Sequence, residues 1–242
     1  MKDWIYQSAI KIRSFLSGEN KELPYYILIF LAFLFFVFAI NLFVELTDEL
    51  KGPSIEFYDQ QITAFFTSLR SPGLTQFVVF ITDIGDVYGY LVLTAIAMIF
   101  FLWKFKSLKF VLQLVGVLLL SILSNMALKR AIDRARPSEE HLVVVESLSY
   151  PSGHAMCAMA FYGFLIYLLF QIRMSRWLRV GLVCLFVFMI LGIGLSRIYL
   201  GVHYPSDVAG GYIAGLIWVL FCIILFNIID VLRRRNRRAQ MN

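Results

Sequence analysis

Six long apolar segments divide this chain, and they constrain its fold more than any other feature of the sequence. Each is close to the roughly 20 residues that an α-helix needs to cross a bilayer. Inside a bilayer the backbone polar groups must be paired within the segment, so such stretches favour helices. The sequence therefore predicts an all-α integral membrane protein, a bundle of six transmembrane helices. The expected spans are residues 25–44, 87–103, 108–128, 155–172, 177–198 and 208–232.

The composition supports a membrane protein. Of the 242 residues 60% are hydrophobic and 16% are charged, whereas soluble domains have roughly 45–50% and about 25%. These values exclude disordered, collagen-like and disulfide-framework proteins. The net charge of +6 does not indicate a nucleic-acid partner, because most basic residues lie between the apolar segments.

The first apolar segment predicts an uncleaved anchor. It is longer than the 7–15 apolar residues of a signal peptide, and no small-residue cleavage pattern follows it. No internal repeat or low-complexity linker is visible, so we expect residues 1–242 to form a single domain.

The distribution of Lys and Arg predicts the orientation in the cell membrane. Basic residues in short loops favour the cytoplasmic side, and 15 of the 22 fall on one side of the alternating spans. Both termini are therefore expected in the cytoplasm. These fifteen are Lys2, Lys11, Arg13, Lys21, Lys104, Lys106, Lys109, Arg173, Arg176, Arg179, Arg233, Arg234, Arg235, Arg237 and Arg238.

Basic residues on the outer side are concentrated in two loops. Five of the seven outer residues follow the third or the fifth span, which indicates that something at the outer face requires positive charge. The seven are Lys51, Arg70, Lys129, Arg130, Arg134, Arg136 and Arg197.

The stretch between the first two spans, residues 45–86, predicts an outer interfacial helix. Tyr58, Ile62, Phe65, Phe66 and Leu69 share one helical face. We expect this helix to lie in the outer interface and to pack over the bundle, as a lid or scaffold or as a wall of the lipid access path.

The three cysteines indicate no chemistry. Cys157, Cys184 and Cys222 each lie inside an apolar segment without a Cys or His neighbour at metal-ligand spacing. All three are predicted to be small buried hydrophobic residues.

A basic motif follows the third span. Lys129 and Arg136 lie seven residues apart, before Pro137, in the pattern K-x6-R-P. This spacing places both on roughly one helical face. Basic residues at a helix end are also favoured by the helix dipole, so the motif alone is a weak signal.

A second motif opens the fourth span, in the sequence Tyr150-Pro151-Ser152-Gly153-His154. Ser152 is a predicted cap of the following helix, whose first backbone amides can bind an anion. A capping Ser-Gly turn is common, but it does not explain His154 at the mouth of a span.

The third motif lies between the last two spans, with the pattern S-R-x5-H-x3-D from Ser196 to Asp207. His203 and Asp207 are four residues apart, so the carboxylate can orient the imidazole and raise its basicity. A lone pair of this kind is often structural. Two histidines and three cations on one side of the membrane favour a functional site over a purely structural role.

Together these residues predict a phosphate site. Lys129, Arg136 and Arg197 supply positive charge, and Ser152 with the Gly153 amide supplies neutral donors. In phosphoryl transfer one imidazole attacks phosphorus and the other protonates the departing oxygen. No acidic cluster suited to magnesium is evident near the motifs, so we expect neither metal nor cofactor. The acidic residues nearby are Asp133, Glu139, Glu140, Glu146 and Asp207.

The ordered trio K-x6-R-P, P-S-G-H and S-R-x5-H-x3-D resembles the type 2 phosphatidic acid phosphatase superfamily. The motifs span residues 129–207, and the six-span plan covers nearly the whole chain. Within the superfamily, the chain looks similar to the bacterial phosphatidylglycerophosphatase B branch.

The resemblance implies a role for each motif residue. His203 would be the nucleophile that forms a phosphohistidine, Asp207 its partner and His154 the general acid. The phosphoryl oxygens would be bound by Lys129, Arg136, Ser152, Gly153 and Arg197.

The expected function is that of a metal-independent lipid phosphatase at the outer face of the cell membrane. By resemblance the substrate is phosphatidylglycerol phosphate, with undecaprenyl pyrophosphate as the alternative. A channel, a lipid-binding scaffold or a phosphotransferase is a rival hypothesis. A channel is disfavoured because the charged residues gather at the span ends. The sequence does not determine the oligomeric state.

Other polar residues near the motifs leave alternatives open. Arg130, Arg134 and Asp133 either contact a lipid head group or form salt bridges with one another. Asp83, Gly85 and Asp86 either touch the site or form a solvated helix start. Asn125 is expected to make an interhelical hydrogen bond.

Overall fold

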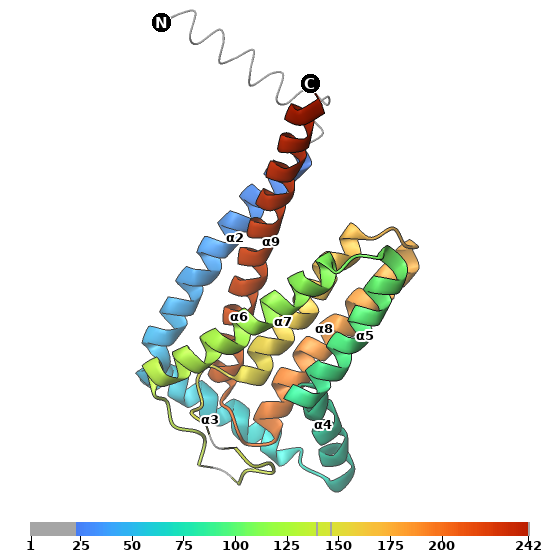
Figure 1. The fold of residues 1–242 in the computed structure, drawn as a ribbon. Helices are drawn as coiled ribbons and strands as arrows, with labels where there is room; N and C mark the ends of the chain where they lie inside the picture. The colour runs from blue at the N-terminus through green and yellow to red at the C-terminus, as the bar shows by residue number, and fades with distance from the viewer. Residues whose placement is uncertain (1–22, 139, 146, 242) are drawn as a thin grey trace, which may run out of the picture. The chain divides into compact units, whose positions relative to one another are not determined.

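A computed structural model describes residues 23–138, 140–145 and 147–241 of the chain, and α-helices make up most of this part (Figure 1). The predicted cytoplasmic residues Lys2, Lys11, Arg13 and Lys21 lie outside the described residues. The helices are α2 (Leu23–Asp48), the short 3-10 helix η1 (Glu49–Lys51), α3 (Pro53–Ser68), α4 (Pro72–Ile84), α5 (Val87–Phe105), α6 (Lys109–Ile132), α7 (Gly153–Gln171), α8 (Arg176–Tyr199) and α9 (Pro205–Met241).

Six helices are long and apolar enough to cross a membrane, namely α2 and α5 to α9. Their most apolar stretches have a mean hydropathy between 1.6 and 3.0. Each corresponds to one predicted span. The helices α2, α6 and α9 extend beyond the predicted C-terminal boundary by one or more turns, whereas α6 begins and α7 ends one residue inside the predicted bounds. The prediction of an all-α, six-span membrane protein is confirmed.

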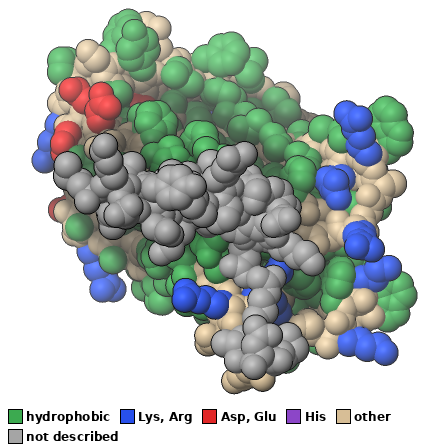
Figure 2. All heavy atoms as spheres, turned by 90° about the horizontal axis from the view of Figure 1, so that it is seen from above, with side chains coloured by type: hydrophobic (Ala, Val, Ile, Leu, Met, Phe, Trp, Pro, Cys, Tyr) green, Lys and Arg blue, Asp and Glu red, His purple; other side chains and the backbone are tan. Residues whose placement is uncertain are grey.

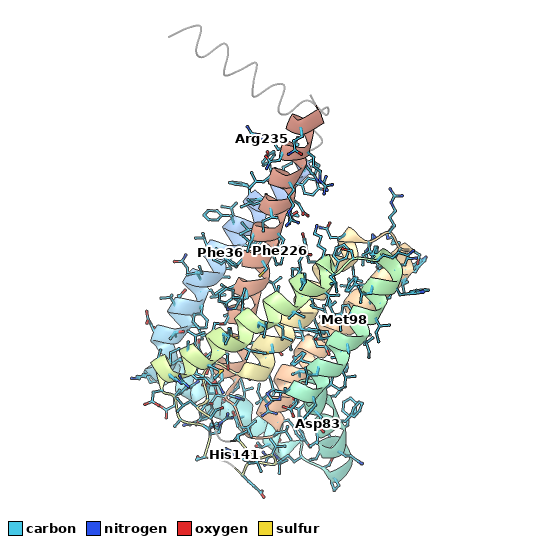
Figure 3. All side chains as sticks on the ribbon, viewed as in Figure 1. Phe36, Asp83, Met98, His141, Phe226 and Arg235 are labelled. Carbon is cyan, nitrogen blue, oxygen red and sulfur yellow. The ribbon has the colours of Figure 1, made fainter. Side chains whose placement is uncertain are left out.

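The contacts divide the chain into two compact units. The smaller unit holds the chain up to Val37 and from Leu220 onward, and the larger unit is Phe38–Val219. In the smaller unit the start of α2 packs against the end of α9. The Phe36 and Phe221 rings lie 6.3 Å apart, and the Arg234 guanidinium lies over the Tyr25 ring. Figure 3 labels Phe36 and Phe226 on these two helices.

In the larger unit α7 is the most deeply buried span. It packs against α6 on one side and α8 on the other, and α5 packs against α6. Because α7 is covered by neighbours, it can be apolar on all faces. Its buried residues include Phe161, Phe164 and Leu168. The outer faces of α5 and α8 are apolar and exposed, as a surface in contact with lipid must be. Figure 2 shows broad hydrophobic surface between separate groups of Lys and Arg side chains.

The cysteine prediction is correct for two residues and wrong for one. Cys157 and Cys222 are buried, whereas Cys184 on α8 is exposed. A small apolar side chain on a lipid-facing helix needs no protein partner, since the bilayer itself is apolar.

The stretch between the first two spans holds two helices, where the sequence analysis expected one. Both α3 and α4 begin at a proline in their first turn, Pro53 and Pro72. Proline is favoured there because the first amides of a helix have no intrahelical partner. Helix α4 ends at Ile84 with Gly85 as its C-cap, and α5 begins two residues later at Val87.

Helix α3 packs against the bundle as expected, but most of its apolar face is turned away from the protein. Tyr58 and Phe65 are each 60% exposed, and only Phe66 packs against the buried cluster of Ala155, Ile198 and Val208. The buried side of α3 instead carries Asp59, which is 3% exposed.

Asp59 explains this orientation. Its carboxylate lies 2.7 Å from the Arg134 guanidinium and accepts hydrogen bonds from the backbone N–H and the hydroxyl of Ser206. A buried carboxylate without partners is very costly, so pairing Asp59 outweighs burying the aromatic face. Those aromatic side chains remain available to lipid.

Replacing Asp59 by alanine should therefore destabilise the protein by about 1–3 kcal/mol, because donors of Arg134 and Ser206 lose their acceptor. The thermal unfolding midpoint of purified protein in detergent measures the effect. Gln60→Ala is the matched control, because Gln60 is exposed and its side chain bonds only Glu56. Equal small shifts in both variants would show that the Asp59 contacts do not fix α3.

Candidate active site

The predicted site residues converge at one end of the larger unit. The loop 133–152, the loop 200–204, the end of α4 and the start of α7 meet there, and Figure 3 shows Asp83 and His141 at this end. A cavity of about 200 Å³ lies between them. Six of the eight predicted site residues line it: Lys129, Arg136, Gly153, His154, Arg197 and His203. The other two, Ser152 and Asp207, lie fully buried behind the lining.

His203 is held from both ring nitrogens. Its Nδ1 lies 3.5 Å from Asp207 Oδ2 and 3.3 Å from the Ser149 hydroxyl. Its Nε2 lies 3.3 Å from Arg136 Nη1 on the cavity side. The prediction that Asp207 pairs with His203 agrees with this geometry. Nε2 is the ring nitrogen turned toward the predicted phosphate-binding cations.

Asp207 has more partners than the sequence indicated. Its Oδ1 lies 2.6 Å from Arg134, and its Oδ2 accepts hydrogen bonds from Ser149 Oγ at 2.5 Å and from the Tyr204 backbone N–H at 2.8 Å. These contacts fix the carboxylate of a residue with no exposed surface. Asp207 therefore acts as a rigid support for the His203 ring.

Burial keeps His203 neutral. Removal from water lowers the pKa of His203 to about 3, although the Asp207 carboxylate opposes this shift. At neutral pH the ring then carries one proton, which Asp207 or Ser149 can accept at Nδ1. In this tautomer the unprotonated Nε2 carries the lone pair and accepts the hydrogen bond from Arg136 Nη1.

Lys129 and Arg136 meet at Ser147, a residue that the sequence analysis did not single out. Lys129 Nζ donates to Ser147 Oγ at 2.8 Å, and Arg136 donates to the Ser147 carbonyl at 2.6 Å. Arg136 also donates to the carbonyl of Val202. The two basic residues of the first motif are thus fixed on one wall of the cavity.

Arg197 approaches the cavity from α8. It is 5% exposed, and its Nη1 donates to Thr82 Oγ1 of α4 at 2.7 Å. Within the described residues its Nε has no hydrogen-bond partner. A buried guanidinium donor without an acceptor is costly, and an anion in the cavity would supply one.

Ser152 does not cap α7 through its side chain, so that prediction is wrong. Its hydroxyl is buried without a partner in the described part of the chain, while its backbone N–H donates to the Asp207 carbonyl. The open hydroxyl and the first amides of α7 therefore remain as donors at the cavity.

Asn125 supports this turn from α6. Its side chain donates to the Pro151 carbonyl, in the loop before α7, at 3.0 Å. The predicted interhelical bond is the weaker one that Asn125 makes to Met156 Sδ of α7 at 3.5 Å. Gly153 lies so close that an added Cβ would stand 3.0 Å from Asn125 Oδ1. The absence of a side chain at position 153 permits this approach.

His154, the second histidine, has a partner outside all three motifs. Its Nε2 lies 2.8 Å from Asp86 Oδ1 at the start of α5. Contact with the His154 ring lowers the pKa of Asp86, so this carboxylate is charged at neutral pH. Of the alternatives left open for Asp86, the structure favours contact with the site.

One known protein family matches this chain. The model of the PAP2 superfamily matches residues 110–229. Phosphatidylglycerophosphatase B of Bacillus subtilis strain 168 is 32% identical over 179 residues, which cover 72% of this chain and 86% of the relative. The chain belongs to the PAP2 superfamily.

A solved PAP2 structure has the same fold. The crystal structure of a transmembrane PAP2 type phosphatidylglycerolphosphate phosphatase from Bacillus subtilis superposes with a TM-score of 0.74 at 28% identity, covering 79% of this chain and 95% of that one. An undecaprenyl-diphosphatase from Sulfolobus acidocaldarius is 28% identical over 150 residues, 61% of this chain and 68% of that one. This PAP2 chain is therefore a multi-pass membrane protein and a lipid phosphatase.

In this PAP2 protein Arg134 forms salt bridges, but with partners other than those that the sequence analysis named. It bridges Asp59 and Asp207, whereas Asp133 and Arg130 are exposed. Burial lowers the pKa of Arg134, but the two carboxylates outweigh burial and raise it. Its contacts hold Asp207 in place, and no part of its side chain lines the cavity of His203.

Among the described residues no group of three His, Cys, Asp or Glu side chains has the arrangement of a metal centre. Glu139 and Glu146 lie outside the described residues. The charges around the cavity are mainly cationic, which suits a phosphate rather than a metal ion.

Proposed function

We propose that this protein hydrolyses the terminal phosphomonoester of phosphatidylglycerol phosphate and releases phosphatidylglycerol and phosphate. The name of the Bacillus subtilis relative supports this substrate, as do the cations around the cavity. Three of them, Lys129, Arg136 and Arg197, line a space of about 200 Å³, which suits a phosphoryl group.

The main support for a lipid substrate is a second, apolar cavity that adjoins the first. It has a volume of about 420 Å³ and lies among α5, α6 and α7. Asp86, Gly153 and His154 line both cavities. A phosphate in the cationic cavity would thus lie beside a space suited to hydrocarbon. Its apolar lining includes Leu91, Val115, Leu118, Leu119, Ile122 and Met126.

This arrangement favours access from the side of α5 and α6. The sequence analysis proposed that the helix near Phe65 and Phe66 walls the lipid path, but neither residue lines the apolar cavity. The exposed surface of Leu91 and Leu119 lets an acyl chain reach the cavity without leaving an apolar environment.

The first chemical step forms a phosphohistidine at His203. Nε2 attacks phosphorus, the N–P bond forms, and the bond to the lipid oxygen breaks. That oxygen takes a proton from His154, so the lipid leaves as an alcohol. Lys129, Arg136 and Arg197 stabilise the charge on the three equatorial oxygens.

The second step returns the enzyme to its starting state. Water attacks phosphorus, gives a proton to His154, and the N–P bond breaks to release phosphate. Positioned cations supply the charge stabilisation in both steps, and we therefore propose that the reaction needs no metal.

A second candidate substrate is undecaprenyl pyrophosphate, the lipid diphosphate suggested by the Sulfolobus relative. The cationic cavity binds a terminal phosphoryl group, which both lipids carry. The alternative is kept because the apolar cavity is open enough for either hydrocarbon chain.

Purified protein should therefore hydrolyse phosphatidylglycerol phosphate with a higher kcat/KM than undecaprenyl pyrophosphate or phosphatidic acid in the same detergent. The rate should be unchanged in excess chelator. Higher activity on the pyrophosphate would promote the alternative, and loss in chelator with recovery on adding magnesium would overturn the metal-free mechanism.

The apolar cavity supplies a matched pair of variants for this assay. Thr94→Trp fills the cavity and should raise KM for a long-chain substrate by about tenfold, with little effect on a short-chain one. Ile96→Trp places the same ring on an exposed face of α5 outside the cavity and is the control. Equal effects of both variants on both chain lengths would show that the acyl chain does not use this cavity.

We also propose that the site faces the outside of the cell and that both termini are cytoplasmic, on the basis of the Lys and Arg distribution. In a background without native cysteines, Glu140→Cys should react with a membrane-impermeant thiol reagent in intact cells, and Lys104→Cys should react only after lysis. Both residues are exposed. The opposite pattern would place the chemistry in the cytoplasm.

A further inference from the structure

The turn between α4 and α5 lies outside the three motifs and outside the segment matched by the family model, yet it contacts two motif residues. Thr82 accepts a hydrogen bond from Arg197, and Asp86 pairs with His154. This turn therefore packs against the active site, although it is distant from the three motifs in the sequence.

Asp86 stands at the N-terminal end of α5 but does not cap that helix. An aspartate at this position usually accepts a hydrogen bond from the first backbone amides, and here its side chain makes no such bond. The carboxylate instead lies 2.8 Å from His154 Nε2. Half of the Asp86 side chain is exposed, whereas the His154 side chain is mostly buried.

Gly85 makes the contact possible. An added Cβ at this position would stand 3.3 Å from Cδ2 of the His154 ring and would collide with Ile193. The backbone of the turn is closed by hydrogen bonds from Gly85 N–H to the Thr82 carbonyl and from Asp86 N–H to the Asp83 carbonyl. The turn can thus hold Asp86 against the ring only with glycine beside it.

We propose that Asp86 is a positioning residue that holds His154 as the proton donor to the leaving oxygen, and that this pair adapts the site to alkyl phosphomonoesters. The proposal rests on the function proposed above. With Asp86 at Nε2, Nδ1 is the ring nitrogen left to give a proton to the leaving group. The carboxylate stabilises the protonated ring until the proton moves to the departing oxygen.

The chemistry of the leaving group sets the expected selectivity. When a P–O bond to an alkyl alcohol breaks, the oxygen would leave as a strongly basic alkoxide and must be protonated in the same step. An aryl alcohol leaves readily as its anion, and the lipid monophosphate that leaves when the terminal phosphorus of a lipid pyrophosphate is attacked is also a weak base. The Asp86–His154 pair is therefore needed most for a phosphomonoester of an alcohol such as phosphatidylglycerol.

The test compares kcat/KM for an alkyl and an aryl phosphate of the same chain length, because kcat/KM reports only the steps through loss of the leaving group. Asp86→Asn should lower kcat/KM for the alkyl phosphate by at least about tenfold, a part of the roughly 10² to 10⁴ that a general acid contributes. For the aryl phosphate it should change by less than about threefold. Asp86→Glu, which keeps the carboxylate, should restore part of the alkyl activity.

Asp83→Asn is the matched control. Asp83 lines the same cavity and its replacement removes the same charge, but no contact joins it to His154. Asp83→Asn should change kcat/KM for both substrates by the same factor. If Asp86→Asn lowers kcat/KM equally for both substrates, Asp86 has only a general electrostatic or structural role. This result would overturn the proposal.

The His154→Gln variant tests the general-acid role of His154 separately from the positioning role of Asp86. If His154→Gln shows the alkyl-selective loss and Asp86→Asn does not, Asp86 is not the positioning residue but the general acid stands. If His154→Gln lowers kcat/KM equally for both substrates, His154 is not the general acid. If wild-type protein hydrolyses no lipid phosphomonoester, the proposed function fails independently of Asp86.

Discussion

The buried carboxylate of Asp207 is the constraint on which the rest of the site depends. It has no exposed surface, so each oxygen needs donors from the protein. Arg134, Ser149 and the Tyr204 amide supply them, and the His203 ring lies beside the same carboxylate. These donors come from the loop 133–152 and from the turn before α9. Satisfying one charge thus brings these segments together and fixes the nucleophile between them.

The same requirement extends to α3, the first of the two α-helices between the first two spans. Arg134 brings a second positive donor group into the interior, and Asp59 of α3 pairs with it. Asp59 also binds Ser206 at the start of α9. A chain of charges therefore connects α3 to Asp207, and the orientation of α3 follows from the catalytic centre rather than from its own hydrophobic pattern. A buried pair of this kind adds little net stability, but loss of either partner is strongly unfavourable.

Much of this structure could be predicted from the sequence, because lipid imposes simple rules. The six spans followed from segment length and hydropathy, and the motif residues Lys129, Arg136, His154, Arg197 and His203 do line one cavity. Residue type and order along the chain sufficed for these predictions. The existence of α4 was missed because its apolar residues are too few to span a bilayer.

The supporting residues could not be predicted in the same way. Asp59 and Asp86 are single acidic residues in polar surroundings, and a solvated position is the ordinary interpretation of each. Their partners lie 75 and 68 residues away along the chain, so only the tertiary fold reveals them. The sequence analysis identified Asp83 and Asp86 as a polar cluster that could touch the site. Nothing in the sequence shows which of the two aspartates contacts His154. The inward face of α3 could not be predicted either, because it depends on the pairing of Asp59 with Arg134.

The central claim is that His203 becomes covalently phosphorylated without the help of a metal. The most direct measurement is to mix the protein with phosphatidylglycerol phosphate radiolabelled in its terminal phosphate, in excess chelator, and to denature it rapidly in alkali. The account predicts an acid-labile, alkali-stable label on the peptide that contains His203, and no label on the His203→Asn variant. An acid-stable label on a serine, a label that persists in His203→Asn, or a label that forms only when magnesium is added would contradict it.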